Sequence, residues 1–190
     1  MARSRTELRR KYIHLIGLVV PALYWLTGKQ VTLCFVAFFL FLFTAFELYR
    51  IRRGIPVKKA ATIAKPLIRS HEKRGIGAHV FFAAGAFVAV LAYPKEVAIA
   101  ALLMATLADG GAAVVGSMCG RHKLIGRKTL EGSLTLFLIA IVLAAWLVKP
   151  FLAAFVGAIA AACVELLPTN DNLTVPVAAG LAMHVVRYFS

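Results

Sequence analysis

The chain has 190 residues, of which 61% are hydrophobic and 16% are charged, and 22 basic residues face only 8 acidic ones. A soluble nucleic-acid-binding protein would explain the positive charge, but a mean hydropathy of +0.83 and repeated long apolar runs favour a polytopic membrane protein. Basic loops facing anionic lipid explain the charge in that class, and a phosphate-rich substrate would use the same charge. The length favours one membrane-embedded domain over residues 1–190.

The apolar windows predict an all-α fold with about seven transmembrane helices. Their expected ranges are 13–28, 31–49, 77–94, 97–118, 133–148, 150–167 and 173–189. Several ranges are shorter than the roughly 20 residues that usually cross a bilayer core. Six spans with one half-buried helix are therefore the alternative.

The basic residues divide between the two sides that these spans define. Eighteen fall in the N-terminal segment, in the loop 50–76 and in the loop after the fourth span, and four fall on the other side: Lys29, Lys95, Lys149 and Arg187. The positive-inside rule places the larger group, and with it the N-terminus, in the cytoplasm, and leaves the C-terminus outside. Residues 58–69 of the long loop predict a basic amphipathic segment on the inner leaflet, which serves either as an anchor or in substrate access.

A polar segment, Asp109–Ser133, interrupts the apolar pattern, with six glycines, four basic residues and two carboxylates. After Asp109, the pair Gly110-Gly111 predicts that a helix opens or breaks, which would free backbone N–H groups for an anion. Gly116 and Gly120 have a spacing that also serves helix packing, within one molecule or between two.

Two basic clusters follow within this segment, at residues 120–123 and 126–129. Arg121, Lys123, Arg127 and Lys128 are placed to hold a triphosphate from two sides. The P-loop spacing is absent. Thr129 with Glu131 and Gly132 has the alternative role of capping the next helix.

Carboxylates are scarce, and five of them gather at the expected cytoplasmic ends of spans: Glu47, Asp109, Glu131, Glu165 and Asp171. Such convergence beside lysine and arginine suits a Mg²⁺–phosphate site, and a buried ion-pair network is the alternative.

A second polar segment, Glu165–Pro176, lies on the same expected side. In it Asp171 would hold a metal or take a proton from an attacking hydroxyl, whereas a plain turn also explains Asn170–Asn172. His14 and His79 have packing or interfacial positions, and no cysteine or histidine pair has zinc-ligand spacing.

The order of these motifs resembles the CTP-dependent lipid-alcohol kinases, a family that includes dolichol, phytol and farnesol kinases and yeast-type diacylglycerol kinase. The resemblance covers nearly the whole chain and rests on these elements: Glu7…Arg10-Lys11…His14, Glu72-Lys-Arg-Gly75…Gly85, Asp109-Gly…Gly116…Gly120-Arg121, Lys128-Thr129-x-Glu131-Gly132-Ser133 and Glu165…Asp171-Asn172-x-Thr174-x-Pro176. The Lys-Thr-x-Glu-Gly-Ser element is also similar to phosphatidate cytidylyltransferases, whereas the Glu…Asp-Asn element favours the kinases.

The resemblance implies transfer of the γ-phosphate of CTP, with Mg²⁺, to a membrane lipid alcohol such as a polyprenol, a phytol-like isoprenoid or diacylglycerol. It implies catalytic roles for Asp109, Lys128, Glu131 and Asp171. CTP would contact Gly116, Gly120, Arg121, Lys123, Arg127, Lys128, Thr129 and Asn172. Mg²⁺ would be held by Asp109, Glu131 and Asp171, with Glu165 as a further ligand. A cytidylyltransferase that makes a CDP-lipid is the alternative enzyme, and an anion transporter or lipid-binding membrane protein is the non-enzymatic alternative.

Overall fold

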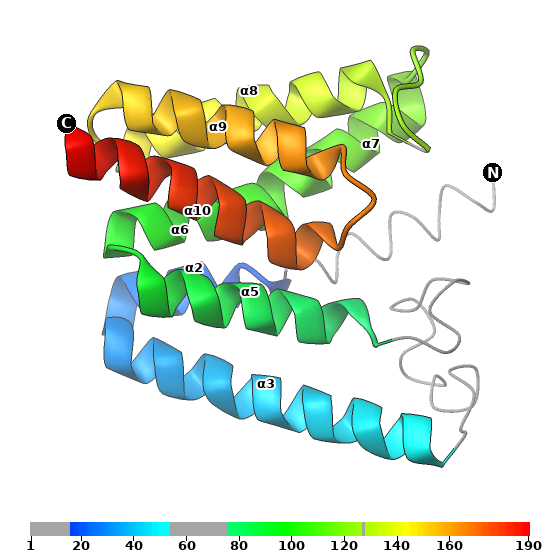
Figure 1. Cartoon of the computed structure of the whole chain (residues 1–190), viewed down its shortest axis with the longest axis vertical. Coiled ribbons are helices and arrows are strands. Elements are labelled where there is room, and N and C mark those ends of the chain that lie inside the picture. The colour runs from blue at the N-terminus through cyan, green and yellow to red at the C-terminus, as the bar shows by residue number, and fades with distance from the viewer. Residues whose placement is uncertain (1–15, 54–75, 127) are drawn as a thin grey trace.

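The computed structural model describes residues 16–53, 76–126 and 128–190, and in this part of the chain the regular structure is helical (Figure 1). One isolated antiparallel bridge joins Lys123 to Thr129. The helical segments are α2 (Val19–Thr27), α3 (Lys29–Arg52), α5 (Ala78–Ala92), α6 (Lys95–Leu103), a π-helical turn η2 (Met104–Ala108), α7 (Asp109–Cys119), α8 (Leu130–Leu147), α9 (Phe151–Glu165) and α10 (Asp171–Phe189).

The all-α prediction is confirmed for the described residues. The segments α6, η2 and α7 form one continuous helix, so that the described residues contain seven helices, at the positions of the seven expected ranges. By length and composition, three of them can cross a membrane: Lys29–Arg52, Lys95–Cys119 and Leu130–Leu147. The shorter α5 and α9 are also apolar, and these helices together indicate a membrane protein. The count of seven spans stays a prediction, and the segment 58–69 and His14 lie outside the described residues.

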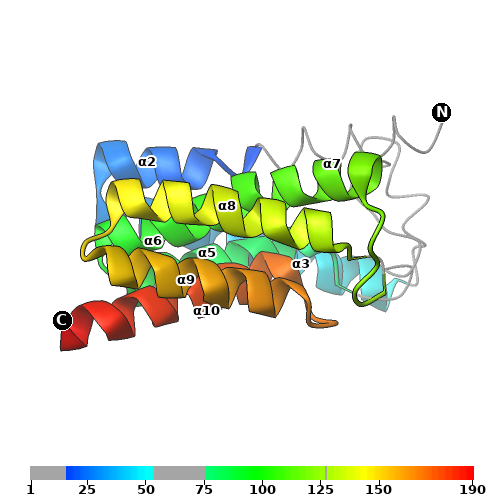
Figure 2. The ribbon, with the colours of Figure 1, turned by 90° about the horizontal axis from the view of Figure 1, so that it is seen from above.

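The connections alternate between the two ends of the bundle (Figures 1 and 2). The loop residues 120–126, 128 and 129 and the loop 166–170 lie at one end, together with the last turn of α3 and the first turn of α5. The turn at Gly28, the turns before α6 and α9, and the C-terminus lie at the other. The two predicted groups of basic residues are therefore at opposite ends wherever the structure describes them. Which end faces the cytoplasm stays a prediction.

Basic residues at the C-terminal end of the bundle are engaged in tying helices together. Lys29 Nζ donates to the carbonyl of Leu91 at 2.8 Å, and Lys95 Nζ donates to the carbonyl of Trp25 at 2.9 Å. Both carbonyls are in the last turn of a helix, where carbonyls lack intrahelical donors. These lysines therefore serve the packing of α2, α3, α5 and α6.

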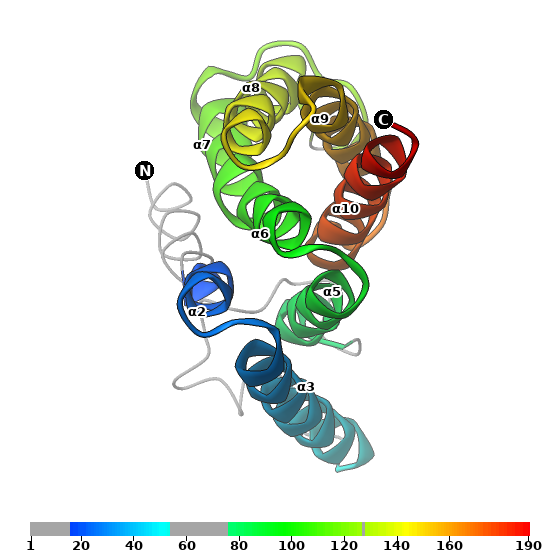
Figure 3. The ribbon, with the colours of Figure 1, turned by 90° about the vertical axis from the view of Figure 1, so that its left-hand side faces the viewer.

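Alanine dominates the buried core, and α6 lies at its centre, with Val97, Ala98, Ala100, Ala101 and Leu102 fully buried. Small residues allow transmembrane helices to approach closely. In the end-on view α6 lies between the group α8–α10 and the group α2, α3 and α5, with α3 at the edge (Figure 3). Large apolar side chains on the outer faces are exposed, among them Phe41, Val142 and Trp146, as expected where the surroundings are lipid.

The predicted helix break at Asp109 is wrong. The chain continues as α7 through Asp109, and the irregularity lies one turn earlier, in the π turn Met104–Ala108. Within it the buried Thr106 hydroxyl donates to the carbonyl of Leu102 at 2.9 Å and is 3.3 Å from that of Leu103. Packing against α8 accompanies this continuity despite the two glycines, which by themselves weaken a helix.

Candidate active site

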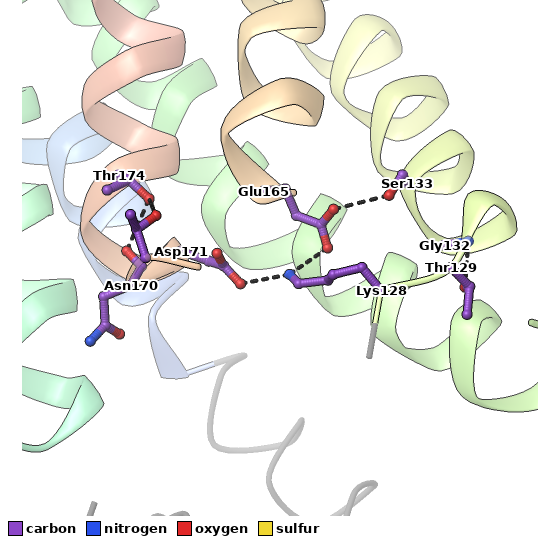
Figure 4. Close-up of polar contacts among 9 residues, drawn as sticks. Lys128, Thr129, Gly132, Ser133, Glu165, Asn170, Asp171 and Thr174 are labelled. Carbon is purple, nitrogen blue, oxygen red and sulfur yellow. Dashed lines mark hydrogen bonds and ion pairs between the residues drawn. The ribbon is translucent and has the colours of Figure 1, made fainter. Parts of the chain in front are cut away.

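Lys128 joins the two polar segments of the sequence. Its Nζ atom lies 2.5 Å from Glu165 Oε1 and 2.7 Å from Asp171 Oδ2 (Figure 4). Lys128 belongs to the loop before α8, Glu165 is the last residue of α9, and Asp171 is the first residue of α10. The fold therefore brings together at one point three residues from two separate polar segments of the sequence.

Glu165 is held at both of its carboxylate oxygens. Besides Lys128 at Oε1, the hydroxyl of Ser133 donates to Oε2 at 3.0 Å. Only 4% of the Glu165 surface is exposed, which is tolerable for a carboxylate because both oxygens have donors. From the sequence, Glu165 is predicted only as a further metal ligand, whereas in the structure its carboxylate joins Lys128 to Ser133. The sequence gives Ser133 no predicted role, and its place at the end of the Lys-Thr-x-Glu-Gly-Ser element is the one signal for it.

Asp171 has one oxygen without a donor. Its Oδ2 atom meets Lys128, but its buried Oδ1 atom has no hydrogen-bond partner among the described residues. The carboxylates of Asp109 and Glu165 both act electrostatically on Asp171, which places Asp109, the first residue of α7, in the same polar region. A buried acceptor without a donor is the kind of group that a bound ion, water or substrate hydroxyl satisfies.

Lys128 stays protonated at neutral pH. Burial by itself lowers the pKa of its ammonium group, but hydrogen bonds and charge interactions with Asp171 and Glu165 outweigh burial and raise the pKa above its ordinary value. The group is therefore a permanent positive charge in this site, and it is not a proton acceptor at neutral pH.

The loop before α8 carries the other predicted phosphate-binding residues and is exposed at residues 121–123. His122 Nδ1 lies 2.8 Å from Glu131 Oε1, and the His122 backbone N–H also points to this oxygen at 3.2 Å. Arg121 and Lys123 are exposed in the same loop, and Arg127 lies outside the described residues. The nucleotide contacts predicted for Arg121, Lys123 and Arg127 stay predictions. No sequence pattern predicts the contact between Glu131 and His122.

The glycines of this region bring α7 and α8 close together. A Cβ atom on Gly116 would lie 2.9 Å from Thr129 Oγ1, and one on Gly120 would be equally close to that atom. Thr129 caps α8, because its Oγ1 accepts a hydrogen bond of 3.2 Å from the Gly132 N–H. The capping alternative is therefore confirmed, and the two glycines pack against Thr129 of the same chain. Nucleotide contacts of Gly116, Gly120 and Thr129 stay predictions.

A separate buried cluster joins α3 to α5 at the same end of the bundle. Arg50 donates to Glu47 Oε2 through Nε at 2.8 Å and Nη2 at 2.6 Å, while His79 Nε2 lies 3.4 Å from Glu47 Oε1. Glu47 and Arg50 are 5% and 4% exposed. For Glu47 this geometry matches the ion-pair alternative.

The carboxylates of this site could supply some, but not all, of the ligands of a divalent cation. Among the residues that the structure describes, no group of three or more His, Cys, Asp or Glu is placed to hold a metal ion. Mg²⁺, however, is commonly bound by one or two carboxylates together with waters and substrate phosphates. Asp171 and Glu165, whose carboxylates both contact Lys128, offer such a pair, whereas Glu131 is engaged with His122.

Comparison with known proteins gives two weak similarities. An uncharacterized protein of Rickettsia prowazekii is 27% identical over 199 aligned positions, which cover 96% of this chain and 95% of that protein. CTP-dependent diacylglycerol kinase 1 of Schizosaccharomyces pombe is 27% identical over 143 positions, which cover 64% of this chain and 65% of that protein. No family model and no solved structure matches.

The second similarity supports a distant relationship with a CTP-dependent lipid kinase. It agrees with the resemblance drawn from the motifs and with the membrane character of the helices. Neither match supports an isoprenoid or dolichol substrate, or magnesium.

Proposed function

We propose that the chain is a CTP-dependent kinase that transfers the γ-phosphate to a membrane lipid alcohol. The observation that carries the proposal is the meeting of Lys128 with Glu165 and Asp171 at one end of an apolar bundle. A membrane surface is where a water-soluble nucleotide and a lipid hydroxyl can meet. The similarity to a CTP-dependent diacylglycerol kinase supports both the nucleotide and the acceptor class.

The reaction requires positioning and charge stabilisation more than covalent chemistry. The acceptor oxygen forms a bond to the γ-phosphorus while the bond to the β–γ bridging oxygen breaks, so that CDP leaves. Asp171 is the proposed acceptor of the hydroxyl proton, since its Oδ1 atom has no donor of its own. Lys128, with Arg121 and Lys123 of the exposed loop, would neutralise the phosphate oxygens.

A divalent cation is part of the proposal. Asp171 and Glu165 would hold it, with Asp109 close by, and Mg²⁺ would supply charge neutralisation on the transferred phosphate. The chain's own contribution is to fix the carboxylates. Ser133 orients Glu165, and the first turn of α10 places Asp171 beside it.

Product analysis of the purified full-length protein tests the function. The protein would be reconstituted in lipid and given γ-labelled CTP with diacylglycerol, phytol, geranylgeraniol or a polyprenol. The expected products are CDP and the labelled lipid phosphate, with diacylglycerol the first acceptor to try. Pyrophosphate release with phosphatidate as the acceptor would instead establish the cytidylyltransferase.

Site variants connect turnover to the proposed residues. Asp171→Asn and Asp109→Asn are expected to lower turnover by roughly 10²- to 10⁴-fold, the range for lost acid–base or charge groups. Glu96→Gln is the matched control, because Glu96 pairs with Arg187 at the opposite end of the bundle. Retained CTP binding with lost turnover supports chemistry. If Asp109→Asn left an anion flux unchanged and no acceptor was phosphorylated, the transporter would be the better account.

A further inference from the structure

We propose that Lys128 is an exchangeable internal counter-ion, which occupies the place of a divalent cation between Glu165 and Asp171 and leaves it when the cation binds. This inference deepens the proposed function and rests on it for the identity of the cation. It assigns the cation to Glu165 Oε1 and Asp171 Oδ2, the two oxygens that now face the lysine.

The first argument is the geometry around Nζ. One ammonium group bonds two carboxylates from different helices, at 2.5 Å to Glu165 and 2.7 Å to Asp171. The two carboxylate side chains are 5% and 16% exposed. Two carboxylates this well buried need a cation between them, since each would otherwise remain a poorly solvated negative charge.

The second argument is that the lysine satisfies the pair incompletely. One positive charge faces two negative charges, and Asp171 Oδ1 is buried without a donor among the described residues. A divalent cation brings the missing charge, and carboxylate oxygens are its preferred ligands. The cation and the ammonium group would use the same oxygens, so they compete.

The third argument is that Lys128 can move without the loop moving. Its backbone N–H donates to the Ile125 carbonyl at 3.0 Å, and its carbonyl accepts from Leu124 N–H at 2.9 Å. The backbone is thus fixed in a turn, while the side chain is 29% exposed and has a flexible four-carbon stem. Exchange is therefore a rotation of the side chain, which frees the ammonium group for a phosphate oxygen.

The two possible roles of Lys128 predict opposite results for cation binding without nucleotide. A lysine that only binds phosphate leaves the cation affinity unchanged when it is removed. A competing counter-ion raises the affinity, since its removal vacates the two oxygens and deletes a positive charge beside them.

Manganese binding to the full-length protein in detergent, followed by electron paramagnetic resonance without nucleotide, tests this difference. Lys128→Met is expected to bind Mn²⁺ at least about tenfold more tightly than the unsubstituted protein. Lys123→Met, which removes an exposed lysine of the same loop, is the matched control and is expected to change little. Equal affinities in the two variants, or no binding by Lys128→Met, would overturn the proposal.

Chemical labelling of the unsubstituted protein gives a second test that does not depend on a variant folding. Lysine acylation read by mass spectrometry is expected to be slow at Lys128 and to rise several-fold when excess Mn²⁺ is added, while Lys123 stays constant. Labelling of Lys128 that does not respond to Mn²⁺ contradicts the exchange. Neither test uses turnover, so a failed lipid-kinase assay and a failed exchange are separate outcomes.

Discussion

Ser133 on α8 donates a hydrogen bond of 3.0 Å to Oε2 of Glu165, the last residue of α9. The bond occupies one carboxylate oxygen and fixes the rotation of the group, while Lys128 contacts the other oxygen. A small hydroxyl residue that no motif assigns to chemistry therefore sets the orientation of the most buried carboxylate in the site.

Replacing Ser133 with alanine is expected to reduce both stability and turnover. The loss of one hydrogen bond to a charged, buried acceptor costs about 1.5–3 kcal/mol. Thermal unfolding and turnover would be measured together, with Ser117→Ala as the control. Ser117 donates to the Val114 carbonyl on an exposed part of α7, so its loss is expected to change stability by less than about 0.5 kcal/mol. Equal effects of the two substitutions would mean that the Glu165 contact is not special.

Glu47→Gln is expected to destabilise the protein strongly. The change removes the negative charge that receives two hydrogen bonds from the buried Arg50, and breaking a buried pair typically costs about 3–5 kcal/mol. Glu96→Gln breaks an ion pair whose side chains are 46% and 38% exposed, and the expected cost is about 0.2–1 kcal/mol. Chemical denaturation in detergent compares the two. If the folded Glu47→Gln protein keeps full turnover, the cluster is structural; a selective loss of turnover would assign it a role in the reaction.

Gly132→Ala is expected to separate α7 from α8. The added Cβ atom would lie 2.9 Å from the backbone carbonyl of Ala112, which cannot move without its helix, and overpacking of this kind costs roughly 1–3 kcal/mol. Gly111→Ala is the control at the same helix pair, because its Cβ atom meets only the flexible end of Ile139 and a contact with Thr135. If the melting temperature fell equally in both variants, the contact between Gly132 and the Ala112 backbone would not be what limits the distance between α7 and α8.

The stabilisation from Lys128 has a predicted pH dependence. Its raised pKa means that the contribution is complete below the ordinary value of 10.5 and is lost as the pH rises through the still higher pKa of the folded state. The difference in melting temperature between the unsubstituted protein and Lys128→Met is therefore expected to be constant over roughly pH 7 to 9 and to shrink only above 10.5. A difference that disappears near neutral pH would show that the lysine is deprotonated there.

The helices and the two polar segments follow from the sequence because both are local signals. Apolar runs between charged loops predict the helices, and glycine with basic residues marks the polar segment after Asp109. The pairing of Lys128 with Glu165 and Asp171 is different, since 37 and 43 residues separate the partners. Only the packing of α8, α9 and α10 creates it. The pair Gly110-Gly111 is a second example. Its local signal predicts a break, but the pair lies within a continuous helix, because packing against other helices stabilises a segment whose own helix propensity is low.

The π turn at Met104–Ala108 has a consequence for the whole helix from Lys95 to Cys119. Such a turn acts as the insertion of one residue into an α-helix, which rotates everything after it by about 100°. Two different faces of one helix are thereby presented to the same side of the bundle, one before the turn and one after it. Deleting a single residue there would keep the helix and its apolar character, but would swing Asp109 away from α10. The register of this helix, more than its composition, decides where that carboxylate points.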